Sequence, residues 1–275
     1  MGTLLYFIVS FIFAGIYMFL FNITQFEPIN ILWGFLSTVL GLMSAFVLFL
    51  GAFAIIGYSI RSINPHSMRR HRFVNGVLKI AFNLLNVKLV VTGRDNIPSP
   101  GENFVFVCNH QENYDIMAIK PVLKDHPVNF IAKKEVFSWL VLGHWIKILG
   151  NIPIAREADR SAAESIVKGI KMYNSGIPMA IFPEGKRTFG NAMIDFKPGA
   201  FKLAMKPKAP ILIGTIYDFS KVFKGWPILR QKIYLHFHPI LTPETYKDMN
   251  SIELSKYVKQ IIQDTLDEYE KRLKS

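Results

Sequence analysis

The hydrophobic pattern divides the chain at about residue 60. Residues 3–21 and 31–60 are uncharged apolar runs, and the link between them holds Glu27 and Pro28. A helix rises about 1.5 Å per residue, so about 20 apolar residues cross the roughly 30 Å core of a bilayer. A cleaved signal peptide is disfavoured, because no basic segment precedes the first run and a second run follows it. The pattern predicts a membrane-anchoring helical hairpin over residues 1–60, which either spans the bilayer or lies within one leaflet.

After residue 86 the pattern changes to short β-rich runs that alternate with helical stretches. Turn-forming Gly, Pro and Asn residues separate these elements. Such alternation predicts an α/β domain. The predicted strands cover residues 87–92, 104–107, 128–132, 179–182, 211–216 and 233–237, and the predicted helices cover residues 116–123, 162–173, 200–205 and 252–273.

Almost all charge lies after the hairpin. Glu27 is the only charged residue before Arg61, so the rest of the chain carries 32 Lys and Arg against 19 acidic residues, a formal net charge of +13. By the positive-inside rule residues 61–275 are predicted to form a cytoplasmic domain. The basic residues directly behind the second apolar run are Arg61, Arg69, Arg70 and Arg72.

Residues 61–86 combine this basic cluster with apolar residues at helical spacing, which predicts an amphipathic helix. Two interpretations stay open: a helix that faces the core of the domain, or an interfacial helix that binds anionic lipid headgroups. The basic excess fits an anionic bilayer, phosphorylated substrates, an acidic carrier protein or nucleic acid. Nucleic acid is disfavoured, because no interleaved aromatic and basic platform is found.

The first chemical motif follows the predicted strand at residues 104–107. His110 and Asp115 flank a polar stretch that leads into an apolar helix. A chain reversal between them would let Asp115 accept a hydrogen bond from one imidazole nitrogen and leave the other nitrogen free to take a proton. Such a pair suits acyl transfer from a thioester to an alcohol. The thioester is already activated, so the base needs only to deprotonate the attacking alcohol. Taken alone, this spacing is more often an ordinary loop.

Two further segments carry charge beside turns. Residues 181–188 run from a strand into a Pro/Gly turn, where Lys186 and Arg187 could face a phosphate. The other is a pair of stretches, residues 131–137 and 150–156. Taken alone, each of these charged stretches is typical of a solvated loop. No metal site is predicted, because the chain has one cysteine, Cys108, interpreted as a core thiol rather than as an acyl nucleophile. His236 and His238 lack a third ligand and are interpreted as structural.

Taken together in this order, the motifs resemble the bacterial type of the 1-acyl-sn-glycerol-3-phosphate acyltransferase family, also called lysophosphatidic acid acyltransferases. The resemblance covers about half the chain and implies a mixed β-sheet flanked by helices. Three positions depart from the usual pattern: Glu112 and Lys186 stand where Ser and Thr are common, and Ala209 replaces Val. The matching segments are Asn109-His110-Gln111 to Asp115, Lys133-Lys134-Glu135 to Arg156, Phe182 to Thr188, and Ala209 to Leu212.

This resemblance implies a role for each matching residue. His110 is the general base, Asp115 orients it, and Glu184 with Gly185 shapes the glycerol site. The acceptor of this family carries a phosphate, which several cationic side chains are expected to bind; Arg can form bidentate hydrogen bonds with it. Adjacent lysines cannot be separated by sequence, so the substrate-phosphate candidates are Lys133 or Lys134, Arg156, Lys186 and Arg187.

The sequence therefore predicts an enzyme that forms phosphatidic acid at the cell membrane. The acyl donor is acyl carrier protein or acyl-CoA, the acceptor is the sn-2 hydroxyl of 1-acylglycerol 3-phosphate, and no other cofactor is expected. Alternatives within the class are acylation of glycerol 3-phosphate or of another lysolipid. An alternative of another class is a non-catalytic membrane lipid-binding protein, which would not need the His110 and Asp115 pair.

Overall fold

The contacts within the chain group its residues into two units, Met1–Ile63 and Asn64–Ser275. The structure is a computed structural model and describes residues 2–21, 23, 28–62, 64, 67–84, 86–112, 114–154, 159–223 and 231–274. The link residue Glu27 lies outside this described part of the chain.

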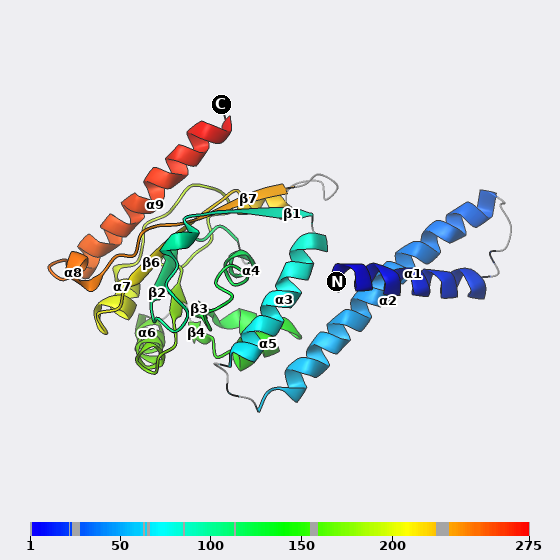
Figure 1. The fold of residues 1–275 in the computed structure, drawn as a ribbon, viewed down its shortest axis with the longest axis horizontal. Coiled ribbons are helices and arrows are strands. Elements are labelled where there is room, and N and C mark those ends of the chain that lie inside the picture. Colours follow the sequence, from blue (N-terminus) through cyan, green and yellow to red (C-terminus); the bar gives the residue numbers. More distant parts are fainter. Residues whose placement is uncertain are drawn as a thin grey trace. The chain divides into compact units, whose positions relative to one another are not determined.

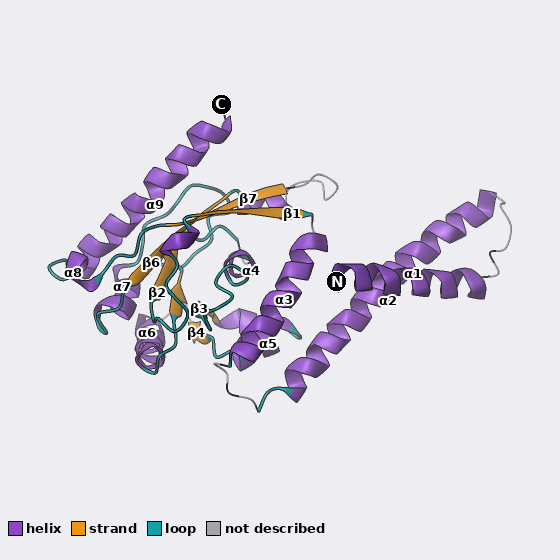
Figure 2. Ribbon diagram, in the orientation of Figure 1, coloured by secondary structure: helices purple, strands orange, loops and turns teal. Residues whose placement is uncertain are grey.

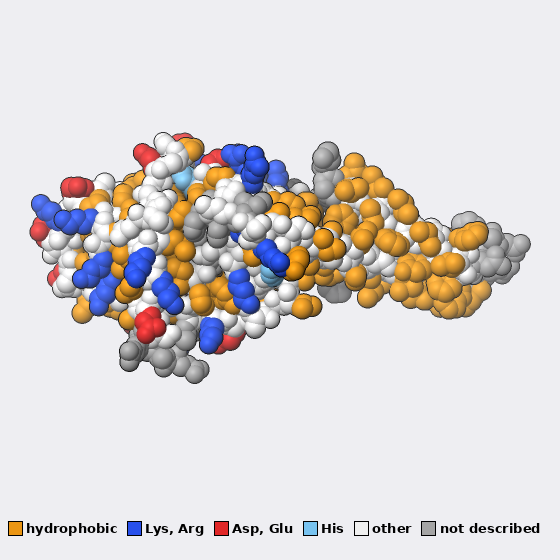
Figure 3. All heavy atoms as spheres, turned by 90° about the horizontal axis from the view of Figure 1, so that it is seen from below, with side chains coloured by type: hydrophobic (Ala, Val, Ile, Leu, Met, Phe, Trp, Pro, Cys, Tyr) orange, Lys and Arg blue, Asp and Glu red, His pale blue; other side chains and the backbone are white. Residues whose placement is uncertain are grey.

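The first unit consists of the two predicted apolar helices, α1 (Gly2–Leu20) and α2 (Pro28–Ser59). The helices approach closely at Gly41, where an added Cβ would lie 2.5 Å from the carbonyl oxygen of Ser10. Their large side chains point outward and give the unit the apolar coat visible in Figure 3. By length and composition α2 is able to cross a membrane, whereas the apolar stretch of α1 is shorter.

The second unit is built on a seven-stranded sheet with the strand order β1-β7-β6-β2-β5-β3-β4 (Figures 1 and 2). Only the β6–β7 pair is antiparallel, so the sheet is mixed, as predicted. The strands are β1 (Val87–Thr92), β2 (Val105–Cys108), β3 (Asn129–Lys133), β4 (Ile152–Ile154), β5 (Met179–Ile181), β6 (Ile211–Tyr217) and β7 (Gln231–Phe237).

Helices cover both faces of this sheet, because strand side chains alternate between the two. Val105 and Val107 of β2 pack with α6, α7 and α9, whereas Phe106 and Cys108 pack on the other side with residues of α3 and α4. The helices are α3 (Met68–Leu84), α4 (Asp115–Ile119), α5 (Leu142–Ile148), α6 (Asp159–Asn174), α7 (Pro198–Met205), α8 (Pro243–Tyr246) and α9 (Ser251–Lys274), and the 3₁₀ helices are η1 (Arg94–Asn96), η2 (Lys134–Ser138) and η3 (Phe219–Phe223).

The predicted helix at residues 116–123 is shorter than expected. It begins at Asp115 and ends at Ile119. Pro121 has no N–H to donate, so the helical hydrogen-bond ladder cannot continue through it. Strand β4 and helix α5 were not predicted, since three and seven residues are too short to show a periodicity.

Helix α3 buries part of its basic cluster. Arg70 donates a hydrogen bond to the carbonyl of Ile148, and the Nδ1 atom of His71 lies 2.9 Å from the Nζ atom of Lys120. Lys120 is itself buried, and this burial lowers its pKa to about 7. The inner face of α3 is therefore part of the domain core, while Arg69 and Arg72 are exposed.

Candidate active site

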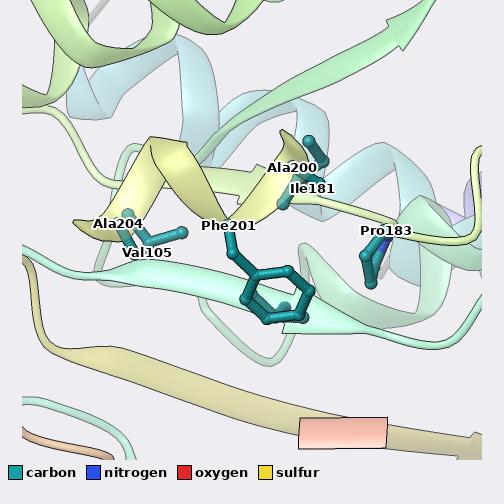
Figure 4. A pocket seen from close by; sticks show the side chains of 7 residues that line it. Val105, Ile181, Pro183, Ala200, Phe201 and Ala204 are labelled. Carbon is teal, nitrogen blue, oxygen red and sulfur yellow. The ribbon is translucent and has the colours of Figure 1, made fainter. Parts of the chain in front are cut away.

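The His110 and Glu184 motifs meet at one edge of the sheet, whereas the segment Ala209 to Leu212 lies at its other end, where Ile211 pairs with Val105 at the start of β2. Strands β2, β5 and β3 are parallel neighbours, so their carboxyl ends lie together. His110 follows the end of β2 by two residues, and Glu184 follows the end of β5 by three. Beneath this edge, α7 closes on β2 and β5 and backs the turn that starts at Pro183. Its packing encloses a narrow apolar gap (Figure 4) lined by Val105, Val107, Ile181, Pro183, Ala200, Phe201 and Ala204.

His110 and Asp115 are brought together by a reversal of the chain between β2 and α4. The Nδ1 atom of His110 lies 2.8 Å from Oδ2 of Asp115. Asp115 is fully buried, whereas the His110 side chain keeps 11% of its surface exposed. The imidazole is stacked on Phe182, with ring centroids 4.3 Å apart. One ring nitrogen is thus held by the carboxylate, and the ring itself is fixed by an aromatic neighbour.

The Asp115 carboxylate is held in place by backbone donors. Its Oδ2 atom accepts hydrogen bonds from the backbone N–H groups of Gln111, at 2.7 Å, and Glu112, at 3.0 Å. Burial raises the pKa of Asp115, and the hydrogen bonds from His110 and the two backbone groups oppose this rise. The same turn therefore supplies the imidazole, the carboxylate and the backbone donors that orient the carboxylate.

Glu184 supports the turn from the neighbouring strand. Its Oε1 atom accepts a hydrogen bond of 2.8 Å from the backbone N–H of His110, and its Oε2 atom accepts one of 3.4 Å from Ile194. Burial raises the pKa of Glu184 to about 7. Only 2% of Glu184 is exposed, so its carboxylate holds the backbone of His110 in this structure. Its predicted contact with the glycerol group stays a prediction.

If His110 acts as a general base, we expect Glu184→Gln to lower the reaction rate by about tenfold, because glutamine keeps one acceptor and places an amide N–H₂ against the N–H of Ile194. As the pH falls through about 7, wild-type Glu184 takes up a proton, so the acid side of the wild-type pH–rate profile should be steeper than that of the variant. Steady-state rates measured between pH 5.5 and 8.5, that is, roughly one and a half units on either side of that pKa, compare the two profiles.

The stability of the two proteins gives an independent check. The folded-state pKa of Glu184 is raised, so the stability that protonated Glu184 contributes is lost as the pH rises through about 7. Glu184→Gln should remove this slope from thermal unfolding, whereas exposed Glu164→Gln should keep it. Identical pH profiles for activity and stability in Glu184→Gln and wild type would contradict the expectation.

Gly185 is required by the backbone of this turn. Its φ angle is +66°, in the left-handed region that favours glycine. An added Cβ would also lie 3.0 Å from Cε of Lys197. Lys197 is a cation beside the turn that sequence reasoning missed, because it is separated from the motif by a long loop.

Several other residues around this turn had no role assigned from the sequence. Thr188 and Phe189 donate backbone hydrogen bonds of 3.1 Å to the carbonyls of His110 and Gln111. The side chain of Asn109 both donates to and accepts from the backbone of Ile216 in β6. Gln111 accepts from the N–H of Phe219 and donates to Asn191. Such contacts join segments about 80 to 110 residues apart, and no local pattern encodes them.

The predicted phosphate-binding cations are only partly assembled. Lys133 ends β3 at the same carboxyl edge, and its Nζ atom lies 3.0 Å from Oε1 of Glu135. Lys134 and Lys186 are exposed, and the guanidinium of Arg187 lies 4.8 Å from the ring centre of Phe189. Arg156 lies outside the described residues.

The described residues hold no group of three His, Cys, Asp or Glu side chains that could bind a metal. Cys108 is fully buried, and burial raises the pKa of its thiol. His236 is 2.8 Å from the hydroxyl of Thr92, and His238 is 2.8 Å from the hydroxyl of Thr215. Within the described chain, these side chains therefore have the contacts of structural residues.

Comparison with known proteins places this site in a family. The Acyltransferase family matches residues 88–216. The 1-acyl-sn-glycerol-3-phosphate acyltransferase of Borreliella burgdorferi is 31% identical over 189 residues, which cover 66% of this chain and 70% of that protein. The alpha enzyme of that name from Ovis aries is 31% identical over 64% of this chain and 61% of its own length. The chain spans 52% of the chloroplastic enzyme of Arabidopsis thaliana, with 26% identity.

A solved structure supports the fold. The crystal structure of the 1-acyl-sn-glycerophosphate acyltransferase PlsC from Thermotoga maritima matches with a TM-score of 0.61 and 23% identity, over 82% of this chain and 97% of that one. These matches define the protein as an acyltransferase. The chain belongs to the 1-acyl-sn-glycerol-3-phosphate acyltransferase family, and the predicted family and α/β fold are confirmed.

Proposed function

We propose that the protein transfers an acyl group from acyl carrier protein or acyl-CoA to the sn-2 hydroxyl of 1-acylglycerol 3-phosphate and so forms phosphatidic acid for phospholipid synthesis. The observation that carries this proposal is the 2.8 Å contact between His110 and Asp115 at the carboxyl edge of the sheet. An oriented imidazole suits a reaction in which the nucleophile is an alcohol and the donor is an activated thioester.

In the proposed reaction, Nε2 of His110 takes the proton of the acceptor hydroxyl while the hydroxyl oxygen attacks the thioester carbonyl. The new ester forms as the carbon–sulfur bond breaks, and the imidazolium returns the proton to the departing sulfur. Asp115 fixes the ring tautomer and stabilises the transient imidazolium. The acyl thioester is a co-substrate, and these steps use no other cofactor.

We assign acceptor binding to the cations and the turn at the same edge. Lys133 is placed there by β3, while Lys186 and Arg187 follow the Glu184–Gly185 turn. A cation near the phosphate would favour an anionic acceptor over an uncharged one, and Arg187 offers bidentate hydrogen bonds. Lys134 and Arg156 complete the set of candidates that the family resemblance implies.

We further propose that the apolar helices anchor the protein in the cell membrane and that residues 61–275 face the cytoplasm. Helix α2 is long and apolar enough to cross a bilayer. The arginines that follow it favour the cytoplasmic side, and the link before it has none. Both acidic acyl donors are found on that side, where the basic domain would attract them.

The test is acyl transfer by the full-length protein in detergent micelles that contain 1-acylglycerol 3-phosphate. Phosphatidic acid should form with an acyl carrier protein or a CoA thioester, and the two donors are supplied in parallel. The same chain length without phosphate, as monoacylglycerol, should react about a hundredfold more slowly, because cations built for phosphate would be left unpaired. Folded protein that acylates neither acceptor with either donor would overturn the proposal in favour of lipid binding without catalysis.

A further inference from the structure

An apolar tip projects from the domain between η2 and α5. It consists of Trp139, Leu140 and Leu142, which are 37%, 94% and 42% exposed. Leu140 is the most exposed large apolar side chain among all residues that the structure describes. Single exposed apolar residues are ordinary on protein surfaces, but three within four positions form a patch that favours contact with a partner.

The backbone holds this tip in its exposed position. Phe137 before it and Trp145 after it are buried, so both ends are fixed in the core. The N–H of Gly143 donates a 2.9 Å hydrogen bond to the carbonyl of Trp139. A Cβ at position 143 would lie only 2.5 Å from the carbonyl oxygen of Phe137, so η2 and α5 approach as closely as glycine permits. The exposure of Leu140 is therefore part of the fold.

The chemistry around the tip fits an anionic bilayer. Exposed Lys134 in η2 and exposed Lys147 in α5 flank it on both sides in sequence. Trp prefers the interface between headgroups and acyl chains, a Leu side chain inserts into the acyl boundary, and lysines bind anionic headgroups. The same chain carries a helix able to cross a membrane, so a bilayer is a partner within its reach.

The tip is also connected to the candidate active site and to the start of the domain. The tip follows β3 closely in sequence: only η2 (residues 134–138) lies between it and Lys133, which ends β3 at the carboxyl edge of the sheet. Helix α5 behind the tip packs on α3 through the stacked rings of Trp145 and Phe73, whose centroids are 5.4 Å apart. Helix α3 in turn follows α2 after residues 60–67.

We propose that the tip inserts into the headgroup region of an anionic bilayer and holds the carboxyl edge of the sheet against the membrane. This contact is separate from the hairpin and belongs to the catalytic domain itself. Insertion does not depend on the proposed function, whereas its benefit, which is delivery of a membrane-dissolved acceptor to His110, rests on it.

Site-specific fluorescence tests the insertion in the full-length protein. Cys108 is fully buried, so a maleimide dye should react selectively with Leu140→Cys. The matched control is Val167→Cys on α6, an apolar position that is 51% exposed and outside the tip. Both proteins are reconstituted in vesicles of phosphatidylethanolamine and phosphatidylglycerol, and quenching by aqueous iodide and by nitroxide-labelled lipid is measured.

We expect iodide to quench the dye at position 140 at least about threefold less than the dye at position 167, and the nitroxide lipid to quench it more. Some molecules are reconstituted in the opposite orientation. The two labelled proteins share the same fraction of such molecules, so the comparison between positions 140 and 167 corrects for them. Equal quenching of the two dyes by both agents would overturn the proposal.

A kinetic measurement tests the benefit. Leu140→Ser should raise the KM for 1-acylglycerol 3-phosphate in the same vesicles several-fold, with kcat and the rate on a short-chain, water-soluble acceptor unchanged. Val167→Ser should leave all three values unchanged. An unchanged KM in Leu140→Ser would overturn the delivery role. Absence of acyl transfer in wild type would instead contradict the proposed function, and the fluorescence result would stand by itself.

Discussion

Replacing His110 by alanine is expected to reduce acyl transfer by about 10²–10⁴-fold, because a positioned general base contributes that much to proton transfer. The imidazole of His110 is mostly buried, with 11% of the side chain exposed; it is stacked on Phe182 and bonded to Asp115. Alanine removes the imidazole that we propose takes the proton of the acceptor hydroxyl. The effect should fall on kcat, since the described contacts of the imidazole are with the protein.

Initial rates with saturating donor, together with thermal unfolding, measure this effect. His126→Gln is the matched control, because His126 is another buried histidine and glutamine can still donate to the carbonyl of Pro98. The control should keep nearly wild-type activity. A His110→Ala protein that folds normally and retains more than about a tenth of the wild-type rate would rule out the base assignment.

Asp115→Asn is expected to have the second largest effect, again about 10²–10⁴-fold on kcat, with little change in stability. One oxygen, Oδ2, accepts from Nδ1 of His110 and from two backbone N–H groups. The asparagine carbonyl can occupy the place of Oδ2 and keep these hydrogen bonds. Its amide replaces Oδ1, but the N–H of Glu112, which lies 3.1 Å from Oδ1, keeps its 3.0 Å contact with the oxygen in the Oδ2 position. What is lost is the negative charge that stabilises the imidazolium as the proton is taken up.

Asp115→Ala separates charge from geometry. It leaves the N–H groups of Gln111 and Glu112 buried without their acceptor, which costs about 1–3 kcal/mol for each unsatisfied group. Its melting temperature should therefore fall, whereas that of Asp115→Asn should stay close to wild type. Full activity in Asp115→Asn would show that the carboxylate serves only to hold the turn.

The sequence was informative wherever a feature is local. The strands β1 and β6 were predicted within one residue, because apolar runs between turn residues have a clear period and length. The two apolar helices followed from composition. His110 and Asp115 could be paired by reasoning that a chain reversal is needed, and the structure shows that reversal.

Features that depend on distant segments could not be predicted. Glu184 binds the backbone of His110 from 74 residues away, and Gln111 meets Phe219 from 108 residues away. The family resemblance pointed to Glu184, and its contact with the glycerol group stays a prediction. Its hydrogen bond to the backbone of His110 was not predicted, since a motif does not show which way a side chain points. It also left open which interpretation of residues 61–86 applies to Arg70 and His71, because burial of a charged residue depends on partners such as Lys120 that lie far along the chain.

The buried face of α3 decides where the protein can be shortened for work in solution. A chain that omits the hairpin must begin before Met68, because α3 supplies Arg70 to the carbonyl of Ile148 and packs Phe82 against Phe219. A chain that began at β1 would open this side of the core to water and bring apolar surface into contact with solvent. The water-soluble form of this enzyme is therefore to be sought by cutting between α2 and α3, with the basic helix retained.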